Sequence, residues 1–173
     1  MRNNVIKDGS IFSTRYGKVK VLNYVNAQNV FILFLQTGYK TKTRATCLRK
    51  GSVKDKLFPT VCGVGFIGEG IYYKTKHIQI YKCWASMMNR CYSDKYHKIK
   101  PTYKNCSVCN EWKNFQNFAE WYIENYPTDG KKYELDKDVK FPGNKIYSPE
   151  KCKFVTKSEN TKEMLRRRHN VKK

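Results

Sequence analysis

The hydrophobic period changes along the chain, and this change restricts the fold to one that combines a β region with a helical region. Three β-branched and aromatic segments, separated by turn residues at 26–29 and 37–38, read as strands over 19–25, 29–36 and 39–46. From His77 onward, apolar residues recur at helical spacing instead. We therefore expect an α+β protein with a basic β module (1–60), a Gly-rich linker (61–76) and a helix-containing domain (77–173).

The predicted sheet carries a row of cations. Phe31, Leu33 and Leu35 share one face of the second strand. Lys40, Lys42 and Arg44 share the other face, on the third strand. Such a row suits contact with a nucleic-acid backbone. Lysines that protect a solvated edge strand produce the same pattern, so both interpretations stay open.

Two helices are expected in the second domain. Residues 77–92 place Ile80, Trp84, Met87 and Cys91 on one stripe. Residues 114–126 begin at Asn114, a predicted N-cap, and repeat the pattern with Phe115, Phe118 and Tyr122. Aromatic stripes of this kind are typical of a buried core.

A compact unit follows near the C-terminus. Residues 133–138 are a predicted strand, 139–151 a loop rich in Pro, Gly, Asn and Ser, and 152–156 a second strand. Thr156 and Glu159 have the spacing of a capping box, which predicts a last helix that runs toward Arg168.

The chain is strongly basic, with 35 Lys and Arg against 14 Asp and Glu and a formal charge of +21. Such a charge destabilises a compact state by self-repulsion and favours a polyanionic partner. The sequence shows no long apolar run and no signal-peptide pattern, so we expect a cytoplasmic protein with double-stranded DNA as partner and no membrane. A merely solvated charged surface is the alternative.

Residues 111–150 depart from this charge pattern, because there eight acidic side chains outnumber six basic ones. Asp136 and Asp138 alternate along a predicted strand, and Asn160 lies in the first turn of the helix that should pack on it. Carboxylate and amide oxygens are ligands for Mg²⁺ or Mn²⁺, which can polarise a phosphodiester. A hydrogen-bonded loop and cap without a metal explains the same residues.

Residues 77–165 resemble HNH-type proteins of bacteriophages, relatives of homing endonucleases with the ββα-metal fold. The resemblance rests on Trp84, Arg90 and Cys91, on Tyr103, Cys106-x-x-Cys109-x-Glu111-Trp112 and Trp121, and on Leu135-Asp136-Lys137-Asp138, Gly143-Asn144, Tyr147-Ser148-Pro149-Glu150-x-Cys152-x-Phe154-Val155-Thr156 and Asn160. It implies that Asp136 and Asn160 bind the metal and that Asn144 orients the general base. The family's catalytic His position is occupied by Lys137, and lysine is ordinarily protonated at pH 7 and takes no proton from water.

The cysteines suggest a second, structural site. Cys91, Cys109 and Cys152 occupy positions where the resemblance also places cysteines, and Cys106-x-x-Cys109 is half of a zinc knuckle. A zinc ion would need a fourth ligand from Cys83 or Cys106. Buried core thiols are the alternative.

Two functions follow, and a third is kept open. The first is a metal-dependent DNA endonuclease or nickase, and the second is a DNA-binding protein with an inactive HNH core that regulates transcription or inhibits a host system. The predicted DNA contacts are Lys40, Lys42, Arg44, Arg90, Arg166, Arg167 and Arg168. The third is an RNA-binding protein that stacks bases on exposed Tyr and Phe, which core-facing aromatic stripes disfavour.

Overall fold

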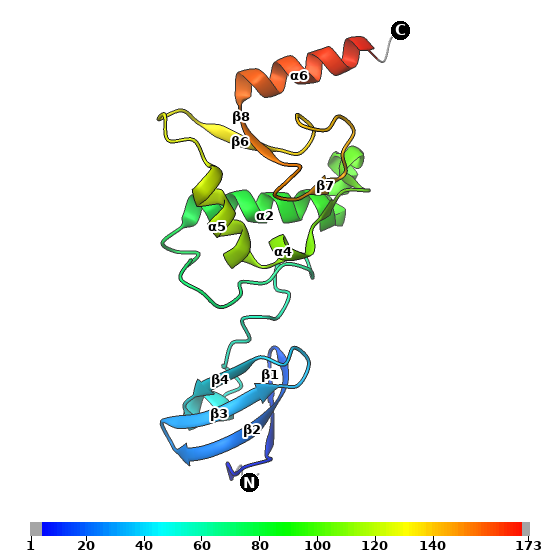
Figure 1. Ribbon diagram of the computed structural model, residues 1–173. Coiled ribbons are helices and arrows are strands. Elements are labelled where there is room, and N and C mark those ends of the chain that lie inside the picture. The colour runs from blue at the N-terminus through cyan, green and yellow to red at the C-terminus, as the bar shows by residue number, and fades with distance from the viewer. Residues whose placement is uncertain (1–4, 171–173) are drawn as a thin grey trace. The chain divides into compact units, whose positions relative to one another are not determined.

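The computed structural model describes residues 5–170, without the side chains of residues 164 and 167–170. The chain is an α+β protein that divides into unit 1 (Met1–Phe58) and unit 2 (Pro59–Lys173) (Figure 1). The elements of unit 1 are β1 (Ile11–Thr14), β2 (Gly17–Asn26), β3 (Asn29–Phe34), β4 (Lys40–Thr43) and α1 (Ala45–Arg49). Those of unit 2 are α2 (Ile78–Tyr92), α3 (Asp94–Ile99), the 3₁₀ helix η1 (Pro101–Tyr103), β5 (Ser107–Val108), α4 (Asn110–Lys113), α5 (Phe115–Asn125), β6 (Tyr133–Asp136), β7 (Ile146–Tyr147), β8 (Lys153–Thr156) and α6 (Lys157–Asn170).

Unit 1 is an antiparallel sheet in the order β1-β2-β3-β4, as the first strands along the ribbon show (Figure 1). The β2–β3 turn is tight because the side-chain oxygen of Asn26 accepts hydrogen bonds from the Gln28 amide and the Asn29 side chain, both at 3.0 Å. The inner face of the sheet packs against α1 and forms a closed core of Phe12, Val19, Val21, Val30, Ile32, Phe34, Tyr39, Ala45 and Leu48.

The register of this sheet places the apolar row of β3 and the lysine row of β4 on the same face, although the sequence predicted opposite faces. Val30, Ile32 and Phe34 are the buried residues, whereas Phe31 and Leu33 pair with Lys42 and Lys40 of β4 on the outer face. Paired residues of neighbouring strands lie on the same face, so the apolar row and the lysine row share one side of the sheet. The uninterrupted apolar run in β3 conceals which alternate residues are buried.

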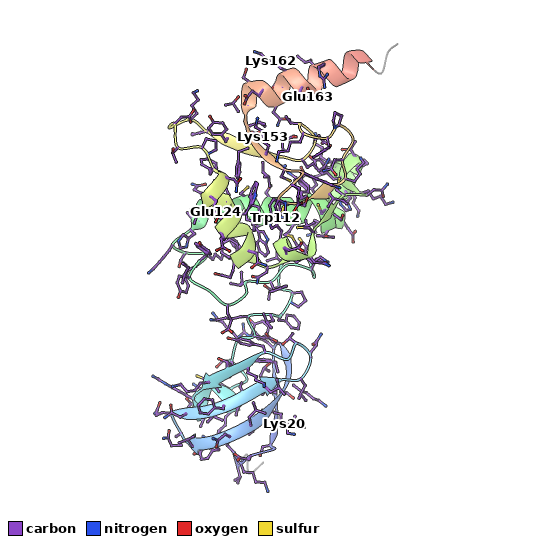
Figure 2. All side chains as sticks on the ribbon, viewed as in Figure 1. Lys20, Trp112, Glu124, Lys153, Lys162 and Glu163 are labelled. Atoms are coloured by element: carbon purple, nitrogen blue, oxygen red, sulfur yellow. The ribbon has the colours of Figure 1, made fainter. Side chains whose placement is uncertain are left out.

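Unit 2 is built around an aromatic core between α2 and α5. The predicted stripe of Ile80, Trp84, Met87 and Cys91 is buried, and the indole N–H of Trp84 donates to the carbonyl oxygen of Trp112 at 2.7 Å. Trp112 lies inside this unit (Figure 2). The side chain of Asn114 accepts from the Gln116 amide and caps α5, which confirms the predicted N-cap.

The Gly-rich segment 61–76 belongs to unit 2, although a linker was expected there. Val61, Val64 and Ile67 pack on the aromatic core, and the amide of Phe66 donates to the carbonyl of Lys113. The side chain of Gln116 ties the segment down, because it accepts from the Tyr72 amide and donates to carbonyls of Ile67 and Tyr72, all at 3.0 Å. The segment is irregular in secondary structure but fixed by these contacts.

The C-terminal part of unit 2 is an antiparallel pair of strands followed by a helix. Strand β6 pairs with β8 from Tyr133↔Thr156 to Asp136↔Lys153, and α6 begins directly after β8 (Figure 1). The predicted capping box is confirmed, since the Thr156 amide donates to Glu159 at 2.7 Å and the Glu159 amide donates to the Thr156 hydroxyl at 3.2 Å. Within residues 5–170, no helix combines the length and apolar character that crossing a membrane requires.

Candidate functional site

The end of β6 is an ordered turn organised by Asp136. Its Oδ1 atom accepts hydrogen bonds from the amides of Asp138 at 2.6 Å and Val139 at 2.7 Å. A carboxylate that accepts two successive amides is an Asx-type turn, which bends the chain sharply after the strand. The turn leaves the other carboxylate oxygen of Asp136 outside these two hydrogen bonds.

Lys137 points from this turn into the protein and is only 5% exposed. Its ammonium donates to Oδ2 of Asp138 at 2.7 Å and to the carbonyl oxygen of Asn144 at 2.6 Å. The side chain of Asn144 in turn donates to the carbonyls of Lys137 at 2.9 Å and Ile146 at 2.7 Å. Lys137 and Asn144 therefore close the 137–146 loop on itself.

One cavity of about 580 Å³ brings several predicted site residues together. Its lining includes Arg90, Tyr103, Asp136, Lys137, Tyr147 and Asn160. Arg90 is half-buried there, hydrogen-bonded to the hydroxyl of Tyr147, with its guanidinium carbon 5.8 Å from the ring centroid of Tyr103. The sequence analysis selected Arg90, Asp136, Lys137 and Asn160 as site residues, whereas it named Tyr103 and Tyr147 only among the residues that carry the resemblance.

Glu134 is the carboxylate that the sequence interpretation did not include. It precedes Asp136 by two residues on β6, and both line the cavity. The side-chain amide of Asn160, in the first turn of α6, donates to Oε2 of Glu134 at 3.1 Å. This bond uses the nitrogen of Asn160 and leaves its oxygen, an acceptor, outside the pair.

The donor atoms fit a magnesium ion in part. Mg²⁺ needs only one or two protein oxygens when water and phosphate complete its shell, and Asp136 and Asn160 offer such oxygens on one cavity. Within the described part of the chain, however, no group of three or more His, Cys, Asp or Glu side chains is placed to hold a metal ion. A divalent cation would therefore depend on these two residues and on ligands from outside the protein.

No histidine of the described chain lines this cavity. The Nδ1 atom of His77 accepts from the amide of Tyr73 at 3.0 Å, and Nε2 of His97 hydrogen-bonds the carbonyl of Arg90 at 2.9 Å. The side chain of His169 lies outside the described residues. Lys137, which is the donor toward both Asp138 and Asn144, offers no lone pair to water.

The cysteines of the predicted zinc site lie in or beside the core of unit 2. Cys91, Cys106 and Cys152 are buried and Cys109 is half-buried. Burial raises the pKa of Cys91 and of Cys152 to about 12 and that of Cys109 to about 11, so these thiols are neutral at pH 7. Burial likewise raises the pKa of Cys83, which was also considered as a ligand, to about 12. Zinc binds thiolates, and the zinc site stays a prediction.

The predicted phosphate contacts fall into two groups. Lys40, Lys42 and Arg44 are exposed on unit 1. On α6, Arg166 is engaged by Glu163, with its Nε atom at 2.9 Å and a terminal nitrogen at 3.0 Å from the carboxylate. The side chains of Arg167 and Arg168 lie outside the described residues. Lys153 and Lys162, which sequence reasoning did not select, are exposed on β8 and α6 (Figure 2).

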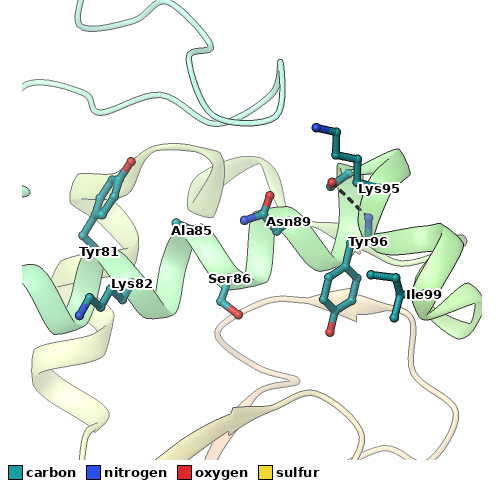
Figure 3. Close-up of a pocket in the computed structure, with 9 residues that line it drawn as sticks. Tyr81, Lys82, Ala85, Ser86, Asn89, Lys95, Tyr96 and Ile99 are labelled. Atoms are coloured by element: carbon teal, nitrogen blue, oxygen red, sulfur yellow. Dashed lines mark hydrogen bonds between the residues drawn. The ribbon is translucent and has the colours of Figure 1, made fainter.

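A separate hollow of about 460 Å³ follows α2 and α3 (Figure 3). Its lining includes Tyr81, Lys82, Asn89, Lys95 and Tyr96. The Ser93 hydroxyl accepts from the Tyr96 amide at 3.4 Å and caps α3 at this position. The hollow contains no acidic side chain and does not include the residues of the β6 turn.

Comparisons of this chain with protein-family models, with curated proteins and with solved structures gave no match.

Proposed function

We propose that the protein binds double-stranded DNA through an HNH-like ββα core in unit 2 that holds the duplex without cutting it. The observation that carries this proposal is the state of Lys137. It occupies the position at which the resemblance calls for the general base, and its ammonium is fixed by Asp138 and by the carbonyl of Asn144. A group in this state cannot deprotonate a water molecule.

The distribution of charge supports DNA as the partner. Lys153, Lys157 and Lys162 are exposed along the end of the hairpin and the start of α6, where Figure 2 labels two of them. Duplex DNA releases counterions when lysines neutralise its phosphates, which is a source of affinity that needs no base contact. Arg90, between Tyr103 and Tyr147, adds a fixed cation at the cavity wall.

Metal-dependent cleavage is the second candidate. It is favoured by one specific observation, namely that Asp136 and Asn160 line the same cavity beside Arg90. A bound Mg²⁺ or Mn²⁺ would polarise a phosphodiester there. The residues of the chain would hold the cation and orient the phosphate, but the described part supplies no base.

The two candidates are separated by one set of assays on the full chain. Duplex binding is measured by fluorescence anisotropy across a salt series, and nicking of a supercoiled plasmid is measured with Mg²⁺ and with Mn²⁺. We expect salt-dependent binding and no nicked product. The measured quantity is the slope of the logarithm of the binding constant against the logarithm of the salt concentration. Changing Lys153 and Lys162 to Ala should make this slope less negative by about 0.9 for each phosphate that is no longer neutralised, whereas Arg49→Ala in unit 1 should leave it unchanged.

The cleavage arm uses Asp136→Ala and Asn160→Ala, with Glu124→Ala as a matched control. Glu124 is an exposed carboxylate of α5 outside the cavity (Figure 2). If the wild type nicks the plasmid and only Asp136→Ala and Asn160→Ala abolish it, the enzyme candidate replaces the first. If the duplex does not bind at low salt, both candidates are wrong.

A further inference from the structure

The outer face of the unit 1 sheet alternates apolar and cationic side chains across its strands. Directly paired positions run Ile11↔Lys20, Lys20↔Leu33 and Leu33↔Lys40. A second row runs Asn23↔Phe31 and Phe31↔Lys42. Each of the central apolar residues Leu33 and Phe31 therefore has a lysine of β4 beside it, and Leu33 has a further lysine on β2.

The apolar side chains of this face are exposed to a degree that is unusual for a solvated sheet surface. Ile11 is 59% exposed, Leu22 40%, Phe31 42% and Leu35 47%. An antiparallel sheet with one buried face normally presents polar side chains on the other. These four apolar residues, with Lys18, Lys20, Lys40 and Lys42, are called the outer face below.

The outer face has no negative charge from its own strands. The strands β1 to β4, all inside the described chain, contain no Asp or Glu. Of the two carboxylates in residues 5–58, Asp55 is buried and accepts from the Thr37 hydroxyl at 2.6 Å, and Asp8 accepts from the Tyr24 amide at 2.7 Å. The lysines of this face are therefore available to an external anion.

We propose that the outer face binds single-stranded DNA, with unpaired bases stacked on Phe31 and phosphates held by Lys20, Lys40 and Lys42. A duplex keeps the faces of its bases stacked inside the helix and offers only phosphates, sugars and groove edges to a flat surface. Such a ligand would use the lysines but would cover Phe31, Ile11 and Leu35 without a matching apolar group. An unpaired strand offers both a charged backbone and the π-faces of its bases.

This assignment does not depend on the proposed function of unit 2. It concerns a different unit, a different form of nucleic acid and different residues. Stacking is tolerant of sequence, because every base has a π-face, so the outer face would act on any exposed strand. Its lysines give affinity that falls with salt less steeply per phosphate than for a duplex.

The test is binding of the full chain to a short fluorescent oligothymidine, measured by anisotropy at two salt concentrations. Phe31→Ala should weaken binding about 30-fold, the middle of the range for loss of one base–aromatic stack. Phe31→Trp should preserve or tighten it, since a larger ring stacks at least as well. Ile123→Ala, which removes an apolar side chain exposed to a similar degree on α5, is the control and should have no effect.

A duplex of the same length and an oligouridine are the other ligands. The proposal requires that Phe31→Ala leaves duplex affinity within about twofold, while Lys20→Ala and Lys42→Ala each lower the salt slope for the single strand by about 0.7. Equal losses for single strand and duplex would identify the face as a duplex-binding surface and overturn the proposal. Unchanged oligothymidine binding, or at least tenfold tighter binding of oligouridine, would also overturn it.

The variants must be shown to fold. Phe31 is on the solvent side of the sheet, so its replacement should leave the thermal unfolding measured by circular dichroism within a few degrees of the wild type. If Phe31→Ala does unfold unit 1, Phe31→Leu takes its place, because it retains apolar area and loses only the aromatic ring. Retained binding by Phe31→Leu, in a folded protein, would then count against stacking.

Discussion

The exposed lysines on the sheet of unit 1 differ sharply from one buried lysine of unit 2. Lys20, Lys40 and Lys42 of unit 1 are exposed on a sheet whose strands have no carboxylate, whereas Lys137 of unit 2 is buried and ion-paired to Asp138 at 2.7 Å. This contrast shows that the total of 35 Lys and Arg overstates the number of cations that phosphate can reach. In unit 2 the ammonium of Lys137 is neutralised inside the fold by Asp138.

The same contrast holds for polar side chains in general. In unit 1 the backbone is held mainly by regular strand pairing, and the buried carboxylate of Asp55 joins the β3–β4 turn to the chain after α1, because it accepts from the Thr37 hydroxyl and the Leu57 amide. In unit 2 irregular segments depend on side chains for the same purpose, as Gln116 does for 67–72 and Lys137 for the β6 turn. Unit 2 should therefore be more sensitive to loss of a single polar side chain.

The largest effect is expected for Lys137→Met. This change keeps the apolar stem and removes the ammonium from a mostly buried ion pair, so the free energy of unfolding should fall by about 3 kcal/mol. Urea unfolding followed by tryptophan fluorescence reports unit 2 alone, because Trp84, Trp112 and Trp121 all lie there. Lys132→Met, at an exposed position of the same unit, should change the value by less than about 0.5 kcal/mol.

Equal urea midpoints for the two lysine variants would mean that the ion pair contributes nothing, and the contrast between the units would then be one of exposure only.

Asp55→Ala gives the next largest effect and tests whether the units unfold separately. It removes the acceptor of the Thr37 hydroxyl at 2.6 Å and of the Leu57 amide at 2.8 Å, so we expect a loss of about 2 kcal/mol. Amide hydrogen exchange should speed up across β1 to β4, while the tryptophan-monitored transition stays in place. A matching shift of the tryptophan transition would show that the two units unfold as one cooperative body.

Local signals were sufficient to predict several elements from the sequence. Helical spacing located α2, and Asn114 and the Thr156–Glu159 pair identified the starts of α5 and α6, because capping involves residues two or three positions apart. Strand β8 was expected within one residue of where it lies. These features depend on neighbours along the chain.

Features that depend on distant residues could not be predicted in the same way. Which alternate residues of β3 face the core cannot be read from its continuous apolar run, because the pairing of β3 with β2 and β4 decides it. The partner of Asn160 is Glu134, 26 residues away, and segment 61–76 is held by Gln116. Candidate site residues were therefore identified by type, while their hydrogen-bond partners were not.

The smallest effect is expected at the start of α6. The capping box there is a local interaction, in contrast to the buried contacts of Lys137 and Asp55. Thr156→Ala removes the hydroxyl that accepts from the Glu159 amide at 3.2 Å and should cost about 1 kcal/mol. Ser158→Ala, in the same turn, is the control. Alanine has a higher helix propensity than serine, so Ser158→Ala should not destabilise the helix, and an equal loss in both variants would show that the missing cap is not the cause.

The carboxylate half of the box adds a dependence on pH. Hydrogen bonds from the Thr156 amide and then from its hydroxyl lower the pKa of Glu159 below its ordinary value of 4.5. A group with a lowered pKa in the folded state stabilises the protein above its unfolded pKa, and that contribution is lost as the pH falls through the folded value. Glu159→Gln should therefore be less stable than the wild type at neutral pH, and the difference should shrink progressively as the pH is lowered below 4.5. A difference between thermal unfolding curves that stays constant down to the acid end would show that the carboxylate charge plays no part in the cap, and that only the shape of the side chain matters there.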